Sequence, residues 1–155
     1  MTNKEALILY KNLNELGFLK GKTFAIAVIR NKRFLKEIVD IHEEMIKPHD
    51  TFISYEQNKI ELGKKHALKD ENGNYVFVDS EKQSIRLKNP EEYKIELHNL
   101  NETYKEVILQ RNTQIQQTNE WLEDTIEVLL NKITENDLPD DISVDQLDKI
   151  FEMVG

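Results

Sequence analysis

The 155-residue chain contains no cysteine. It therefore cannot form a disulfide bond or a thiolate metal site, and it offers no cysteine nucleophile. Long hydrophobic runs are also missing, because the longest apolar segment, Phe24 to Ile29, is far too short to cross a bilayer. The N-terminal residues Met1 to Glu5 lack the apolar stretch of a signal peptide. The sequence therefore predicts a protein of the cytoplasm that neither spans a membrane nor is exported.

The motifs of common catalytic and metal sites are missing as well. The glycines are scattered, so none combines with lysine and serine or threonine into a phosphate-binding loop, and there is no Gly-x-Ser-x-Gly motif. The four histidines show no spacing typical of metal ligands. Carboxylate pairs such as Glu43-Glu44 are adjacent in sequence, so they diverge around a helix. We therefore expect a protein without enzymatic activity, bound metal or cofactor.

Charge is divided unevenly along the chain, whose net charge is -8. Residues 1–69 carry 13 Lys and Arg against 9 Asp and Glu, a net charge of +4, and residues 70–155 carry 8 against 20, a net charge of -12. The two halves should attract each other, within one protomer or across a dimer. Binding to nucleic acid or to an anionic membrane depends on excess positive charge, so neither is expected as a partner.

Capping signals and hydrophobic spacing indicate four helical segments. Thr2 and Glu5 form a capping box at the start of the first, and Asn89 followed by Pro90 is typical of a helix start. The predicted helices cover about residues 3–16, 22–65 with a kink at Pro48, 90–123 and 143–154. The two long helices are of similar length, so we expect them to pair as an antiparallel hairpin.

Three segments favour β-structure, namely residues 75–79, 84–88 and 125–133. Asn72-Gly73 lies just before the first of them, and Asn-Gly beside a β-rich run is a strong hairpin signal. The same region offers an alternative. Asp70, Asn72, Asn74 and Glu81 match positions 1, 3, 5 and 12 of a calcium-binding loop, but Tyr75 stands at the sixth position, which requires glycine. The hairpin is therefore favoured.

Together these patterns predict a single domain over residues 1–155 that is mainly α with a small β element (α+β). Its parts are a long antiparallel helical hairpin, short N-terminal and C-terminal helices, and a small hairpin or sheet at one end. Asn31 and His42 fall at seam positions, where buried polar groups set the register of a helical pair. Phe24 to Ile29 is apolar on every side and needs cover on more than one face. A homo-oligomer, most simply a dimer, would supply it.

Short segments along nearly the whole chain carry a resemblance. They are Phe24-Ala25-Ile26-Ala27 followed by Arg30-Asn31, Asn72-Gly73 in an acidic turn, Asn89-Pro90-Glu91-Glu92, Ile126-Glu127-Val128, Asp137-Leu138-Pro139, and a closing helix from Ser143 to Val154. In this order they resemble a family of small uncharacterised proteins from bacteriophages of Gram-positive bacteria. The polar stretch from Gln110 to Asn119 departs from that pattern. The resemblance implies no activity. It implies a phage or prophage product in a bacterial cytoplasm that acts by binding.

One cluster of charge near the start of the second predicted helix is a candidate anion-binding site. Its members are Lys22, Arg30, Lys32, Arg33 and Lys36, with Lys20 just before them and no acidic residue until Glu37. Helix N-termini and arginine side chains suit phosphate groups, so a nucleotide messenger or another phosphorylated small molecule would be the natural ligand. The alternative is that these cations pair with acids of the third helix or of the C-terminal segment.

Three functions remain open at this point. The favoured one is a non-enzymatic, phage-type accessory protein that forms homo-oligomers and binds a host or virion protein. The second is a sponge that sequesters an anionic small molecule, such as a nucleotide immune signal. The third is a virion-assembly or tail chaperone.

Overall fold

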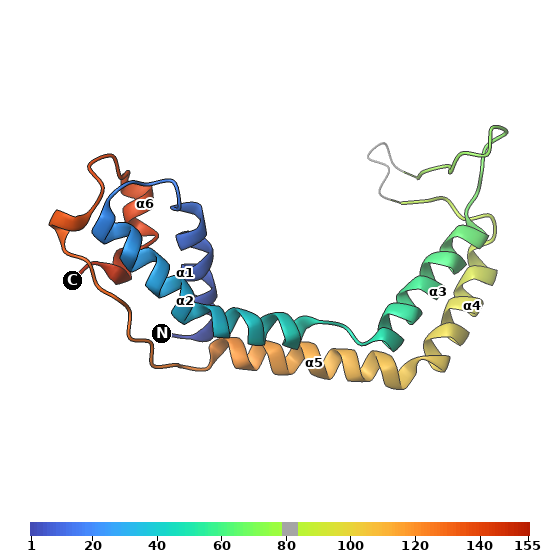
Figure 1. Ribbon diagram of the computed structural model, residues 1–155. Helices are drawn as coiled ribbons and strands as arrows, with labels where there is room; N and C mark the ends of the chain where they lie inside the picture. The colour runs from blue at the N-terminus through green and yellow to red at the C-terminus, as the bar shows by residue number, and fades with distance from the viewer. Residues whose placement is uncertain (79–83) are drawn as a thin grey trace. The chain divides into compact units, whose positions relative to one another are not determined.

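The computed structural model describes residues 1–78 and 84–155 of a mainly helical chain (Figure 1). The chain forms two compact units. Unit 1 comprises Met1–Lys47 and Gln114–Gly155, and unit 2 comprises Pro48–Thr113. The chain therefore passes between the units twice, once after Lys47 and once inside helix α5 (Lys105–Glu123). The expected single domain over residues 1–155 stays a prediction.

Helices α1 (Asn3–Glu15) and α2 (Lys22–Ile46) pack against each other in unit 1. α1 begins at the expected capping box, in which Glu5 N donates to Thr2 Oγ1 at 3.2 Å and Thr2 N donates to the Glu5 carboxylate at 2.7 Å. α2 has no side-chain cap, and its N-cap residue is Gly21, whose φ of 126° is a backbone conformation that favours glycine. The expected boundaries of the N-terminal helix and of the start of the second thus hold to within one residue.

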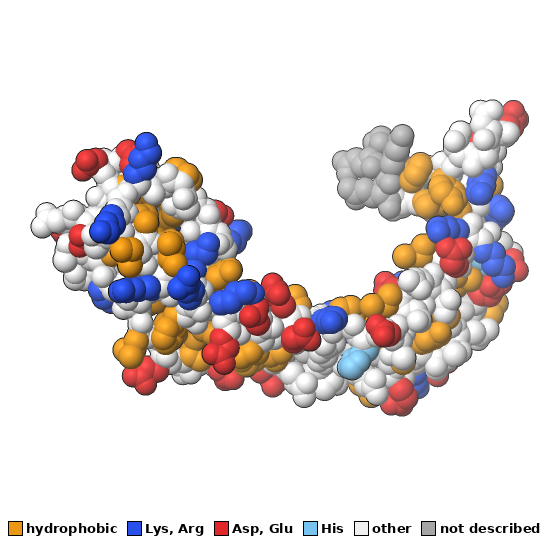
Figure 2. Space-filling view, viewed as in Figure 1, with side chains coloured by type: hydrophobic (Ala, Val, Ile, Leu, Met, Phe, Trp, Pro, Cys, Tyr) orange, Lys and Arg blue, Asp and Glu red, His pale blue; other side chains and the backbone are white. Residues whose placement is uncertain are grey.

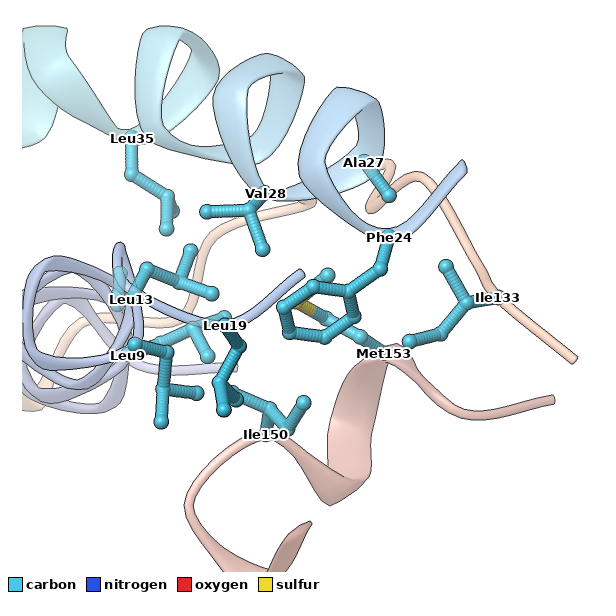
Figure 3. Close-up of a cluster of buried hydrophobic side chains, with 12 residues drawn as sticks. Leu9, Leu13, Leu19, Phe24, Ala27, Val28, Leu35, Ile133, Ile150 and Met153 are labelled. Atoms are coloured by element: carbon cyan, nitrogen blue, oxygen red, sulfur yellow. The ribbon is translucent and has the colours of Figure 1, made fainter. Parts of the chain in front are cut away.

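The core of unit 1 is a cluster of apolar side chains from both ends of the chain (Figure 3). Leu9 and Leu13 of α1 point toward Phe24 of α2, and Ile150 and Met153 close the cluster from the C-terminal end. These five side chains are between 0 and 3% exposed. Burying one such side chain stabilises the fold by roughly 1.5–3 kcal/mol. The short C-terminal segments are therefore part of the core of unit 1.

The two long helices expected over residues 22–65 and 90–123 are each interrupted. α2 ends at Ile46 and α3 (Asp50–His66) follows, so the expected kink at Pro48 is a complete break. The proline ring and its missing N–H are the physical reason. The second interruption has no proline: α4 (Pro90–Thr103) ends where Tyr104 leaves helical geometry with ψ of 17°, before α5. There the Tyr104 ring packs on Tyr55 of α3, with centroids 5.5 Å apart.

Helices pair in opposite directions within each unit. In unit 2, α3 and α4 pack together, with Tyr55 Oη donating to Asn101 Oδ1 at 2.9 Å. In unit 1, the C-terminal part of α2 meets α5 through His42, which stacks on Trp121 with centroids 6.1 Å apart. His42 is half-buried at this contact between two helices, and its role in setting their register stays a prediction. Trp121 is its ring partner in α5.

A glutamine in the polar middle of α5 caps the C-terminal end of α2. Gln114 Nε2 donates to the backbone oxygens of Met45 at 2.7 Å and of Lys47 at 2.8 Å. These carbonyls end α2 and therefore lack the N–H groups that a continuing helix would supply. The departure of Gln110 to Asn119 from an apolar pattern is thus explained at Gln114, because an amide at this position caps the broken helix.

The expected β-strands do not form, since the described residues make only isolated β-bridges and no sheet. Around residues 84–88 and 75–78, Leu68 N donates to Arg86 O, Arg86 N to Val76 O, and Val76 N to Leu68 O, at 2.7, 2.7 and 2.9 Å. Residues 75–78 and 84–88 thus pair at one position, the antiparallel bridge between Phe77 and Ile85, and among the described residues this bridge does not extend into a ladder. Residue 79, the end of one predicted strand, lies outside the described residues.

The acidic turn before these segments forms as the Asn-Gly signal indicates. Asp70 Oδ1 accepts hydrogen bonds from the backbone N–H groups of Asn72 and Asn74, both at 2.9 Å, and Gly73 takes a φ of 83°. The bond from Asn74 contributes most to lowering the pKa of Asp70. The Asp70 carboxylate thus holds its own turn. Glu81, the last position of the calcium-loop alternative, lies outside the described residues.

The C-terminal region also differs from expectation. Residues 125–133 are extended but make single bridges only, from Thr125 to Thr2 and from Ile133 to Val154. Their backbone is held instead by a side chain of α2, as Asn131 N donates to Asn31 Oδ1 at 2.7 Å. The helix expected over 143–154 begins at its capping box but is shorter, with α6 (Val144–Asp148) and a 3-10 turn, η2 (Phe151–Met153), on either side of the fully buried Ile150.

Candidate functional site

The charges of α2 are segregated along the helix. From Lys22 to Lys36 every charged side chain is basic, and from Glu37 to Glu44 every one except His42 is acidic. On the face that Figure 2 shows, lysine and arginine side chains lie over the first half of α2 and acidic ones over the second. The helix macrodipole favours the reverse order, with each end charge worth about 0.3–1 kcal/mol. Stability of α2 alone therefore does not explain the arrangement.

A cleft of about 530 Å³ opens at the start of α2. Lys20 and Lys22 line one side, and Asp137, Asp140 and Asp141 contribute to the other. Lys22 is the member of the predicted anion site that lines this cleft. Three carboxylates against two ammonium groups leave the cleft without the excess positive charge that a phosphate ligand requires. Its lining favours mutual neutralisation.

The other predicted cations lie along the outside of α2. Lys36 donates a hydrogen bond to Asp40 one turn later, and this bond raises the pKa of Lys36. Arg30 and Arg33 are exposed, and neither guanidinium has an acidic partner among residues 1–78 and 84–155. Lys32 is half-buried and points elsewhere, because residues two positions apart do not share a helix face. The structure thus groups Arg30 with Arg33 and separates them from the remaining cations.

Large apolar side chains lie beside these two arginines. Ile26, Phe34 and Ile41 are exposed by 40, 51 and 43%, and Ile29 by 50%. At 100° per residue, Ile26, Arg30, Arg33, Glu37 and Ile41 follow one stripe of α2, with Phe34 at its edge. We call these six residues the α2 outer face. It lies opposite the side chains of Phe24, Val28, Asn31 and Leu35, which are buried in unit 1.

The α2 outer face was only partly visible in the sequence. The run from Phe24 to Ile29 indicated an excess of apolar surface, and the structure divides it: Phe24, Ala27 and Val28 are buried while Ile26 and Ile29 are exposed. Phe34 and Ile41 were not singled out. Phe34 and Ile41 are seven residues apart, and Ile26 is eight residues before Phe34. This spacing is the signal of a second apolar stripe on the same helix.

Unit 2 contains a separate polar cluster beside a groove of about 590 Å³ between α3 and α4. Lys65 Nζ donates to both carboxylate oxygens of Glu96, at 2.7 and 2.6 Å. His66 is buried against the ring of Tyr93, and its Nε2 lies 3.4 Å from Glu96 Oε1 without hydrogen-bond geometry. The bonds from Lys65 contribute most to lowering the pKa of Glu96, desolvation opposes them, and His66 acts in the same direction as Lys65.

This cluster predicts a pH-dependent contribution to stability. Because the pKa of Glu96 is lower in the folded protein than its ordinary value of 4.5, its stabilising effect is present above pH 4.5 and disappears as the pH falls through the lowered value. Glu96→Gln should therefore lower the melting temperature at pH 7, and the difference from the wild type should shrink as the pH falls below 4.5. Thermal melts of both proteins from pH 7 downward test the prediction, and a difference that does not shrink below pH 4.5 would contradict it.

No described helix is both long enough and apolar enough to cross a lipid bilayer. Within residues 1–78 and 84–155, no three His, Asp or Glu side chains gather as a metal-binding group. Comparison with protein-family models, with curated proteins and with solved structures gives no match for this chain.

Proposed function

We propose that this protein is a non-enzymatic binding protein whose α2 outer face engages another protein. The observation that carries the proposal is the combination of exposed Ile26, Phe34 and Ile41 with the guanidinium groups of Arg30 and Arg33. Arginine and large apolar side chains are the residues that contribute most to protein–protein binding energy, and a stripe of both is typical of an interface.

The same proposal includes the setting that the sequence resemblance implies. In it, the chain is a phage-type accessory protein of a bacterial cytoplasm that acts as a homo-oligomer and binds a host or virion protein. A role as a virion-assembly or tail chaperone belongs to the same class, since a chaperone also works by covering apolar surface of a partner. The expected long hairpin corresponds to two separate helix pairs, α2 with α5 and α3 with α4. Of these, α2 would carry the binding surface.

A second candidate is the sponge for an anionic small molecule. Arg30 and Arg33 favour it, because two adjacent arginines without acidic partners among the described residues are suited to phosphate oxygens. Against it, both side chains lie on a convex helix surface beside large apolar groups, whereas small-molecule sites are concave. The protein-binding proposal accounts for the apolar residues as well as for the arginines.

Native mass spectrometry of the purified protein and of the double variant Arg30→Glu/Arg33→Glu separates the two candidates. Protein binding predicts a wild type free of small anions and a variant that has lost its protein assembly. The variant should remain folded, because exposed substitutions change the stability of the single protomer little. A phosphorylated small molecule in equimolar amount on the wild type, absent from the variant, would instead establish the sponge.

A further inference from the structure

We infer that the occupant of the α2 outer face is α2 of a second copy of this chain, packed antiparallel. The inference rests on the proposed function, in which this face binds a protein, and it names that protein. Three observations lead to it: the segregated charges of α2, the exposed apolar residues of its outer face, and the order of charged and apolar residues along that face.

The charge order of α2 calls for a neighbour of opposite order. Its first turn carries Lys22 and no acid, and its last turn carries Glu43, Glu44 and no base. Both ends are therefore of the sign that the helix dipole disfavours. An antiparallel copy of α2 places an acidic end beside each basic end, and the two helix dipoles then point in opposite directions. A parallel copy would place like charges side by side.

The outer face is self-complementary in one particular register. When the two-fold axis passes between Arg33 and Phe34, Ile26 of one copy lies opposite Ile41 of the other. In the same register Arg30 faces Glu37, and Arg33 faces the ring of Phe34. Each pair occurs twice by symmetry, as a two-fold interface requires. The pairs are an apolar contact, an ion pair and a cation–π contact, so every residue of the stripe gains a suitable partner.

Contacts within one chain leave these residues available. Arg30 and Arg33 have no ion-pair partner among residues 1–78 and 84–155, and Ile26, Phe34 and Ile41 keep two fifths or more of their surface exposed. α1 covers the opposite side of α2, where Leu35 and Asn31 are fully buried. The outer face is thus not used by the core of unit 1.

Charge reversal tests the register directly. Arg30→Glu alone places two acids opposite each other twice per dimer, and Glu37→Arg alone does the same with two bases. Each single variant should raise the dimer dissociation constant at least about tenfold. An equimolar mixture of the two variants should form heterodimers, and the double variant Arg30→Glu/Glu37→Arg should again form homodimers, because in both cases residue 30 meets its opposite charge at residue 37. Sedimentation equilibrium of the full-length proteins measures all four.

Lys32→Glu is the matched control, since it makes the same charge change on the same helix away from the outer face. It should leave the dissociation constant within about twofold. A wild type that is monomeric at about 50 μM, or single variants whose mixture stays monomeric, would overturn the inference. The proposed function fails separately: it falls only when Arg30→Glu/Arg33→Glu loses no protein partner at all. If the wild type is monomeric and the double variant loses binding to a different protein, the proposed function holds and the inference of a second copy is wrong.

Discussion

Asn31→Leu is expected to lower the free energy of unfolding by about 2–4 kcal/mol. Asn31 is fully buried, and its amide serves both backbone groups of Asn131: Oδ1 accepts from Asn131 N at 2.7 Å and Nδ2 donates to Asn131 O at 3.1 Å. Leucine has a similar volume but leaves both groups without a partner, and each unsatisfied buried group costs about 1–3 kcal/mol. Urea unfolding of both proteins measures the difference.

Asn131→Ala is the control for this substitution. It removes the bond from Asn131 Nδ2 to Asn31 Oδ1, at 3.2 Å, but keeps both backbone bonds. The loss should therefore be about 1 kcal/mol or less. Equal losses in the two variants would show that the backbone bonds of Asn131 are not what Asn31 contributes. Oligomeric state is the second readout, because the sequence alone assigned Asn31 to the register of a helical pair, whereas its observed partner is the extended segment after α5.

Phe24→Ala is expected to destabilise the protein by about 3–5 kcal/mol. Phe24 is 1% exposed and lies among side chains from α1 and from the C-terminal segments, including Leu13, Ile133 and Met153. Removing the ring leaves a cavity that these separate segments can fill only by moving. A transition by chemical denaturation at a markedly lower concentration, with an unchanged slope, is the expected result.

Phe34→Ala provides the comparison on the same helix. Phe34 is 51% exposed on the outer face, so its loss should change stability by about 0.5 kcal/mol or less while weakening self-association. A loss of stability equal to that of Phe24→Ala would place Phe34 in a core and contradict its assignment to a binding surface. Phe24→Ala, measured at concentrations where the folded fraction is high, should leave self-association intact.

Helix starts were the best predicted features of this fold. The capping box at Thr2, the Asn89-Pro90 start and the helix start at Ser143 all appear where the sequence placed them, because they depend on residues three positions apart or fewer. Helix ends were harder. At the break at Tyr104, the ring of Tyr104 packs on Tyr55, which is far away in sequence, and no local pattern indicates such a contact.

The predicted strands failed for a related reason. Residues 75–78 and 84–88 have the alternation and the Asn-Gly turn of a hairpin, and these local signals produced the turn at Asp70 to Asn74. Whether a ladder extends beyond a turn also depends on other segments, and here Leu68 bonds to both Val76 and Arg86, which also bond directly to each other. Of the predicted anion site, Arg30 and Arg33 remain together, and Lys22, Lys32 and Lys36 have other surroundings.

The contact between Gln114 and the end of α2 links two distant positions of the sequence. Pro48 ends the helical ladder, and the carbonyls of Met45 and Lys47 that it leaves open are occupied by an amide more than sixty residues later. The cost of changing Gln114 therefore depends on the residue at position 48. With a helix-forming residue there, the carbonyls could be satisfied locally and the glutamine would become dispensable. Pro48 and Gln114 are thus expected to vary together rather than singly.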